Sequence, residues 1–138
     1  LIGNERHYAV RAEYGPLVVL GFKGTTDLKD YITDFDLIRL AVTECGQQGC
    51  AHRGIYSYAK QLPISLNTLF DPDKGDELLI LTGHSLGGAV AQLKGFEAYD
   101  LFANSELKSF CSVTTFGAPA ILDKSLKAKL NQIFPDYS

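Results

Sequence analysis

No methionine occurs anywhere in the chain, so the 138-residue sequence has no initiator residue and begins at Leu1. We therefore expect it to be a piece of a longer protein. The lack of a visible signal peptide says little, because a trimmed chain would have lost one. No run of basic residues suggests a nucleic-acid partner, and the formal net charge is only -3. No apolar stretch reaches the roughly 18 residues that a membrane span requires.

The remaining composition is that of an ordinary globular protein, with 46% hydrophobic and 21% charged residues. Its length fits a single domain over residues 1–138, and a domain of this size buries about two-thirds of its unfolded surface. No repeat or linker interrupts the chain. Predicted strands alternate with predicted helices, which indicates the α/β class with a mostly parallel sheet and helices on both faces.

Local patterns place the individual elements. Alternating or continuous apolar residues predict strands over residues 7–13, 17–22, 78–81 and 110–116. A turn at 14–16 joins the first two strands into a hairpin. A glycine-centred loop over residues 23–27 precedes a stretch over 28–38 that we predict to be helical or lid-like. Helical spacing predicts a helical segment over 52–69 with a break at Pro63, and two further helices. Apolar positions of those two helices are Val90, Leu93, Phe96 and Phe102 in one and Leu126, Leu130 and Ile133 in the other.

The chemistry centres on the pentapeptide Gly83-x-Ser85-x-Gly87, which follows the buried strand and opens a helix. This is the pattern of a nucleophile elbow, in which a serine stands clear of the sheet on a sharp turn. Glycines two positions before and after the serine leave room for neighbouring backbone. The N–H of Leu86, at the helix start, is then the first candidate donor to an oxyanion. The alternative is a tight strand-to-helix turn with no chemical role.

Two of the three cysteines, Cys45 and Cys50, stand five positions apart in a polar stretch that we predict to be a loop. This spacing favours a small disulfide loop, with two free thiols as the alternative. No second cysteine pair follows, so we expect no metal site. Cys111 lies in a predicted strand, where a buried, inert thiol is expected.

Four separated stretches together resemble one family, the class 3 or fungal-type lipases, which are α/β-hydrolases. The likeness covers nearly the whole chain and keeps the order and spacing of the family's motifs. The stretches are residues 22–35, 50–56, 82–89 (Thr-Gly-His-Ser-Leu-Gly-Gly-Ala) and 115–119 (Thr-Phe-Gly-Ala-Pro).

The resemblance implies a role for several residues. Ser85 is expected to be the nucleophile, and Thr25 is expected to supply the second oxyanion-hole donor through its backbone N–H. Residues 26 to about 35, including Asp27, Leu28 and Tyr31, match the lid and its hinge. The two cysteines stand where several family members have a short disulfide loop, which strengthens that interpretation.

The sequence also departs from the family. Lys23 replaces the usual arginine, which keeps the charge but loses bidentate pairing. In the family the catalytic Asp and His come tens of residues after the serine, so we expect them outside this chain. Asp136 is a candidate for the triad acid, although it comes early for that role. Among the histidines, His84 is expected to point away from the reacting face and His52 to be structural.

The function these observations predict is that of a serine carboxylic-ester hydrolase, a lipase or esterase acting through an acyl-enzyme on triacylglycerol or phospholipid. Without its acid-base pair, the isolated chain is expected to be nearly inactive. One alternative is a catalytically dead lipase-like domain that binds or regulates. Another is a feruloyl-type esterase of polar substrates.

No cofactor is expected, and the expected partners are an ester or lipid substrate and the missing C-terminal segment of the same protein. Charged and apolar residues alternate over residues 27–35, so transient contact with a lipid interface is allowed but not required. The cysteine pair favours secretion, without fixing the compartment.

Overall fold

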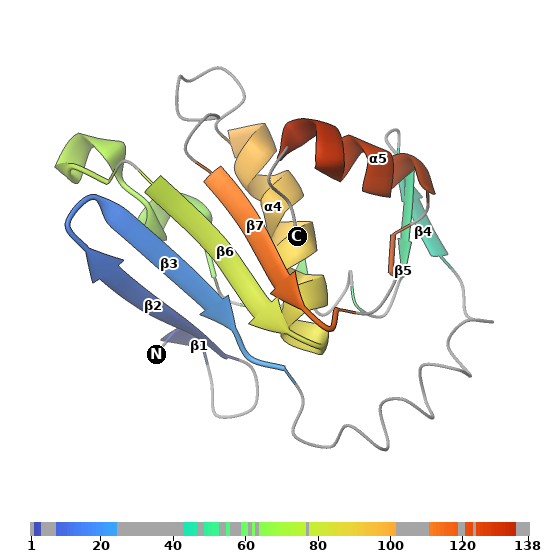
Figure 1. Ribbon diagram of the computed structural model, residues 1–138, viewed down its shortest axis with the longest axis horizontal. Helices are drawn as coiled ribbons and strands as arrows, with labels where there is room; N and C mark the ends of the chain where they lie inside the picture. Colours follow the sequence, from blue (N-terminus) through green and yellow to red (C-terminus); the bar gives the residue numbers. More distant parts are fainter. Residues whose placement is uncertain are drawn as a thin grey trace.

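The structure is a computed structural model of the chain (Figure 1). The described residues are 2–3, 8–24, 43–46, 49–52, 55, 59–60, 62, 64–76, 78–101, 111–118, 121–122 and 124–134. The helical or lid-like stretch predicted over 28–38 and the candidate Asp136 lie outside these residues, as do Thr25, Asp27 and Phe102.

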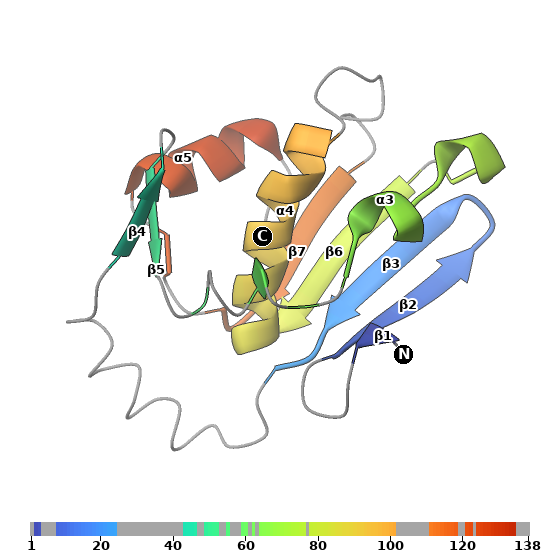
Figure 2. The same ribbon diagram turned by 180° about the vertical axis from the view of Figure 1, so that it is seen from behind.

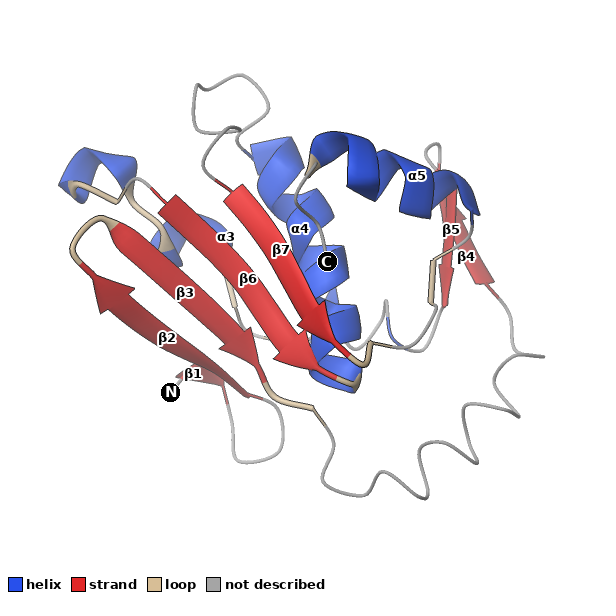
Figure 3. Ribbon diagram, viewed as in Figure 1, coloured by secondary structure: helices blue, strands red, loops and turns tan. Residues whose placement is uncertain are grey.

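A mixed sheet of five described strands forms the centre of the structure, in the order β1-β2-β3-β6-β7. The strands are β1 (Ile2–Gly3), β2 (Tyr8–Tyr14), β3 (Leu17–Phe22), β6 (Leu78–His84) and β7 (Cys111–Phe116). The pairs β3/β6 and β6/β7 are parallel, whereas β1/β2 and β2/β3 are antiparallel. Parallel pairing is therefore confirmed at the centre, with the predicted hairpin at one side (Figure 3).

The hairpin turn follows directly from its two residues, Gly15 and Pro16. Tyr14 pairs with Leu17, so only these two residues lie between the strands. The turn predicted over 14–16 is therefore one residue too long, because Tyr14 belongs to β2. Gly15 has a φ of 56°, while the proline ring holds φ near -65°. A type I′ turn needs positive φ at both central positions, so the turn is of type II′, which takes glycine first.

Helix α4 (Leu86–Leu101) connects β6 to β7 across one face of the sheet (Figure 2). Side chains that alternate along β3 and β6 point toward this helix and are buried. They form one core with Val90, Ala91 and Ala98 of α4; its strand members include Val18, Leu20, Phe22, Leu79, Leu81 and Val113. The opposite face carries exposed apolar side chains, and the predicted second layer of helices is not tested by the described residues.

Two helices shorter than α4 have described bounds: α3 (Leu66–Leu69) and α5 (Lys124–Ile133). In α5 Leu126 and Leu130 are buried, as the helical spacing predicted. Of the predicted helical segment 52–69, α3 is the part for which bounds are described. Its predicted start at His52 is wrong, because His52 is the last residue of a strand, β5 (Gly49–His52). No helix in the described part of the chain is both long and apolar enough to cross a membrane.

The cysteine-bearing stretch differs from its prediction as a loop. Residues Thr43–Gly46 (β4) and Gly49–His52 (β5) pair as an antiparallel two-stranded sheet. The polar, glycine-bearing sequence lacks the apolar alternation that marks a strand, because this small sheet lies apart from the main one. It contacts α5 through β5.

Arg11 connects β2 to the segment that leads into β6. Its Nε donates to the carbonyl oxygen of Leu69 at 2.9 Å, and its Nη2 lies 3.8 Å from Asp76 Oδ2. Asp76 Oδ2 also accepts the N–H of Asp71 at 2.7 Å. These contacts hold the loop around the 3₁₀ turn Pro72–Lys74 against the edge of the hairpin.

Candidate active site

The strand-to-helix corner places Ser85 between the last residue of β6, His84, and the first residue of α4, Leu86. Ser85 has a φ of 55° and is the one non-glycine residue with positive φ in the described part of the chain. Left-handed backbone is disfavoured for an L-residue, and such strain gathers at functional sites. The corner therefore has the conformation expected of a nucleophile elbow.

The glycines on either side of Ser85 are required by close packing of backbone. A Cβ atom on Gly83 would collide with the carbonyl of Gly87 and lie 2.7 Å from the nitrogen of Gly88. A Cβ on Gly87 would collide with the carbonyl oxygen of Phe22 in β3. The elbow thus fits tightly against the end of the neighbouring strand, as the sequence pattern indicated.

The segment after β3 reaches the same corner. A Cβ atom on Gly24 would lie 2.5 Å from the carbonyl oxygen of His84 and 3.8 Å from the nitrogen of Gly87. Gly24 therefore brings the backbone that leads to Thr25 beside the start of α4. Thr25 itself lies outside the described residues, so its predicted role as an oxyanion donor stays a prediction.

The start of α4 carries backbone N–H groups without acceptors inside the helix. The first bond of the helical type runs from Ala89 N–H to the Ser85 carbonyl, at 3.1 Å. The N–H groups before Ala89, including that of Leu86, have no carbonyl group four residues earlier within the helix to bond to. Such a helix start favours a negative oxygen, which suits Leu86 as an oxyanion donor.

The end of β7 supports the corner from the other side, and sequence reasoning did not identify this contact. Ser85 N–H donates to the carbonyl oxygen of Phe116 at 2.9 Å. His84 and Phe116 are register partners in the parallel pair β6/β7. A clue was present in the chain, because Thr115 to Pro119 belongs to the motifs that the family resemblance uses, but main-chain bonds cannot be read from residue types.

Lys23, which stands where the family usually has arginine, lies over an aromatic ring. Its Nζ is 4.9 Å from the ring centroid of Tyr8, within the range of a cation–π contact. Its backbone N–H donates to the Tyr8 carbonyl at 3.1 Å. Both contacts fix the end of β3, which precedes Gly24.

The structure does not describe most of the other predicted site residues. The candidates Asp27, Leu28, Tyr31 and Asp136 lie outside the described residues. Cys45 and Cys50 are Cα partners across β4 and β5. Over the described ranges there is no group of three or more His, Cys, Asp or Glu residues that could hold a metal ion.

A parallel strand, a strained serine at the corner and a helix that returns over the sheet define an α/β-hydrolase. Residues 19–138 match the family Lipase (class 3), and the chain belongs to this family. It is 28% identical over 128 residues to a lipase of Rhizopus niveus, which covers 88% of this chain and 31% of that protein. It is 25% identical over 140 residues to the Saccharomyces cerevisiae protein LIH1, which covers 86% of this chain and 40% of that protein.

Solved structures agree on the fold. The triacylglyceride lipase of Rhizomucor miehei matches with a TM-score of 0.75 and 21% identity, over 96% of this chain and 52% of that one. A triacylglycerol lipase whose catalytic centre is formed by a serine protease triad matches with a TM-score of 0.77 and 19% identity, over 99% and 53%. The chain thus spans about half of these structures and a smaller share of the curated relatives.

Proposed function

We propose that the protein is a serine hydrolase of carboxylic esters in which Ser85 is the nucleophile. The observation that carries this proposal is the left-handed φ of 55° at Ser85, on the corner between β6 and α4. Holding serine in this conformation costs about 1–2 kcal/mol. A turn that only connects a strand to a helix does not require this strained conformation, whereas a nucleophilic serine requires it in order to stand clear of the sheet.

In the proposed reaction Ser85 Oγ attacks the ester carbonyl carbon while its proton passes to a base. The tetrahedral oxyanion receives hydrogen bonds from the N–H groups of Leu86 and Thr25. The alcohol leaves with the proton and an acyl-enzyme remains, which water then hydrolyses. Losing one such donor typically lowers kcat by about 10² to 10³.

The base and its carboxylate partner are not assigned among the described residues. His84 is adjacent to Ser85 in sequence, but the Nε2 edge of its ring faces Gly117. We propose a lipid or other carboxylic ester as the substrate, in keeping with the names of the relatives, which are lipases. We infer no resident metal or organic cofactor.

Covalent capture tests the proposal directly. The full-length protein is incubated with a fluorophosphonate probe, digested, and the labelled peptide is identified by mass spectrometry. The proposal predicts one adduct on Ser85 and none in the variant Ser85→Ala. Absence of an adduct at Ser85 in the folded wild-type protein contradicts it and favours a lipase-like domain that only binds.

A further inference from the structure

A pocket lies beside the middle of α4, apart from the corner at Ser85. Its volume is about 190 Å³, and the apolar part of its described lining consists of Ala59, Leu93 and Phe96. Leu93 comes eight positions after Ser85, so the two residues are about 12 Å apart along the helix axis. The pocket therefore does not belong to the candidate active site.

Four charged residues form the rest of the described lining. Lys60 and Lys94 are cations, and Glu97 and Asp100 are anions. The two pairs of charges cancel, so this lining does not favour a ligand of either charge. Because enclosing an unpaired charge is costly, the molecule that fits this lining best is uncharged and has an apolar body.

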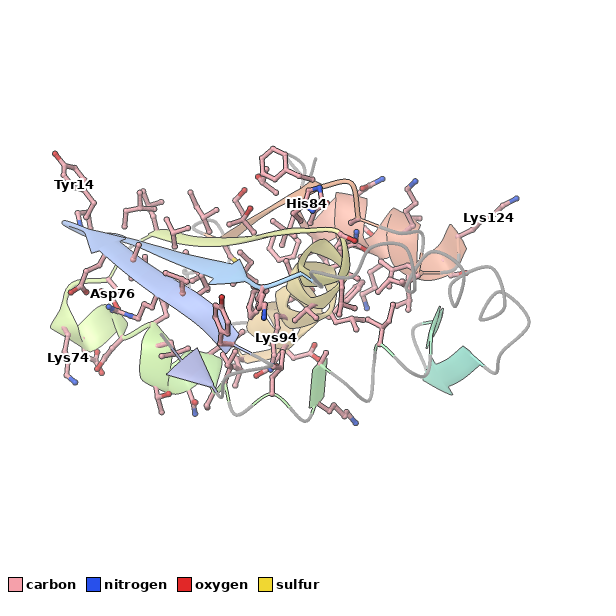
Figure 4. The ribbon with its side chains drawn as sticks, turned by 90° about the horizontal axis from the view of Figure 1, so that it is seen from below. Tyr14, Lys74, Asp76, His84, Lys94 and Lys124 are labelled. Atoms are coloured by element: carbon pink, nitrogen blue, oxygen red, sulfur yellow. The ribbon has the colours of Figure 1, made fainter. Side chains whose placement is uncertain are left out.

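Lys94 is the most buried of these four residues. Figure 4 shows it on the side of the sheet that carries α4, with His84 on the other side. Its side chain is 6% exposed, and its Nζ donates to the Ile64 carbonyl at 3.1 Å and to Glu97 Oε2 at 2.6 Å. An ammonium group has three N–H donors, so one of them has no acceptor in the described part of the chain. A buried donor is costly to leave unpaired, and a ligand oxygen in the pocket would satisfy it.

Glu97 offers the complementary group beside this ammonium. Its Oε2 accepts from Lys94, and among the described residues no hydrogen bond to its Oε1 is found. An ammonium only donates hydrogen bonds, and a carboxylate only accepts them. A ligand group that lies between the two must therefore accept one hydrogen bond and donate another. A hydroxyl group does both, whereas a carboxylate cannot donate to Glu97 and an ammonium cannot accept from Lys94.

We propose that this pocket is a second binding site, for a short aliphatic alcohol. The hydroxyl oxygen accepts the third N–H of Lys94, and the hydroxyl proton is donated to Glu97. The carbon chain lies against the apolar part of the lining. If each non-hydrogen atom takes about the 30 Å³ of a water molecule, the volume holds an alcohol of about six such atoms. The inference does not depend on the role of Ser85, so failure of the proposed function would leave it intact.

The test is a titration of the full-length protein with hexan-1-ol, followed by NMR of ¹³C-labelled alanine and leucine methyl groups. The methyl groups of Ala59 and Leu93 report on the pocket, whereas those of Leu86 report on the corner at Ser85. Hexanoate and hexylammonium are titrated separately, because they keep the six-carbon chain and change only the head group. Circular dichroism checks that each variant is folded.

We expect hexan-1-ol to shift the Ala59 and Leu93 signals along a saturable curve and to leave the Leu86 signals unchanged. Hexanoate and hexylammonium are expected to bind at least about tenfold more weakly, because each loses one of the two hydrogen bonds. Unchanged Ala59 and Leu93 signals overturn the inference, as do shifts confined to Leu86. If either ion binds as tightly as hexan-1-ol, the inference is overturned too, because the pocket then does not select a hydroxyl group.

A matched pair of variants tests the buried donor. Lys94→Met keeps the apolar stem and removes the ammonium, so we expect it to bind hexan-1-ol roughly tenfold more weakly than wild type. The exposed Lys124→Met is expected to bind as wild type does. Equal affinities of Lys94→Met and wild type overturn the inference. If Lys94→Met does not fold, Leu93→Trp replaces it by filling the pocket: lost shifts at Ala59 support the inference, and wild-type binding overturns it.

Discussion

Gly87 and Phe22 lie so close together that a Cβ atom on Gly87 would collide with the Phe22 carbonyl oxygen. The start of α4 therefore meets the end of β3 backbone to backbone. This contact places the strand end that leads to Gly24 beside the corner at Ser85. Both partners are main chain, so neither can yield by turning a side chain.

Replacing Gly87 by alanine is accordingly expected to destabilise the protein by about 1–3 kcal/mol, through overpacking. Urea unfolding measures the change. Gly21→Ala is the control, because its Cβ would meet its nearest atom only at 3.9 Å and its φ is not positive. If Gly87→Ala is as stable as Gly21→Ala, the described approach of the two backbones is wrong.

Lys94 is buried on α4 and is held by two acceptors. Its Nζ donates to the Ile64 carbonyl at 3.1 Å and to Glu97 Oε2 at 2.6 Å. In Lys94→Met the apolar stem is retained, but the carbonyl loses its donor, so we expect a loss of about 1–3 kcal/mol. Thermal or urea unfolding checks this, with exposed Lys124→Met as the control. Equal stability of the two variants would show that the buried ammonium contributes nothing.

Cys45 and Cys50 are cross-strand partners in the β4/β5 pair. Directly opposed residues of an antiparallel pair have Cα atoms about 4.5–5.5 Å apart, which lies within the disulfide range. We predict that mass spectrometry without reduction finds these two residues linked in protein made in an oxidising compartment. If both cysteines are recovered as free, alkylated thiols from protein made in an oxidising compartment, this prediction is wrong, and the argument for secretion is lost with it.

Cys111 is expected to be unreactive in the folded protein, because burial raises the pKa of its thiol from 9.0 to about 12. The thiolate is the reactive form, so iodoacetamide at pH 8 should modify the Cys111 peptide far more slowly in native than in denatured protein. The unfolded thiol ionises first, so this group's contribution to stability is present below about pH 9 and is lost progressively as pH rises toward 12. The stability difference between wild type and Cys111→Ala should shrink over that interval.

Much of the fold could be predicted because its strands carry clear local patterns. The strand at residues 17–22 has its predicted bounds, since alternate residues are buried against α4. The strand predicted over 78–81 extends to His84, because pairing with β7 continues through Gly83 and His84. Residues 82–84 have no apolar pattern from which this extension of the strand could have been predicted.

The remaining differences arise from contacts between distant segments. Helical spacing marked apolar positions of α4, but Gln92 and Lys94 are buried as well. The helix contacts the sheet, α5 and the segment near Ile64. For this reason its polar residues do not all face solvent, and the sequence alone could not show which of them are buried. The candidate serine was found from its glycines, whereas its hydrogen bond to Phe116 depends on tertiary structure alone.

If Ser85 attacks the ester, turnover by the full-length protein depends on this one hydroxyl group. Hydrolysis of p-nitrophenyl esters of several chain lengths is compared for wild type and Ser85→Ala, with both confirmed as folded. We expect wild type to hydrolyse at least one ester and the variant to lose at least about 10³-fold in kcat. Equal rates for the two folded proteins would contradict it.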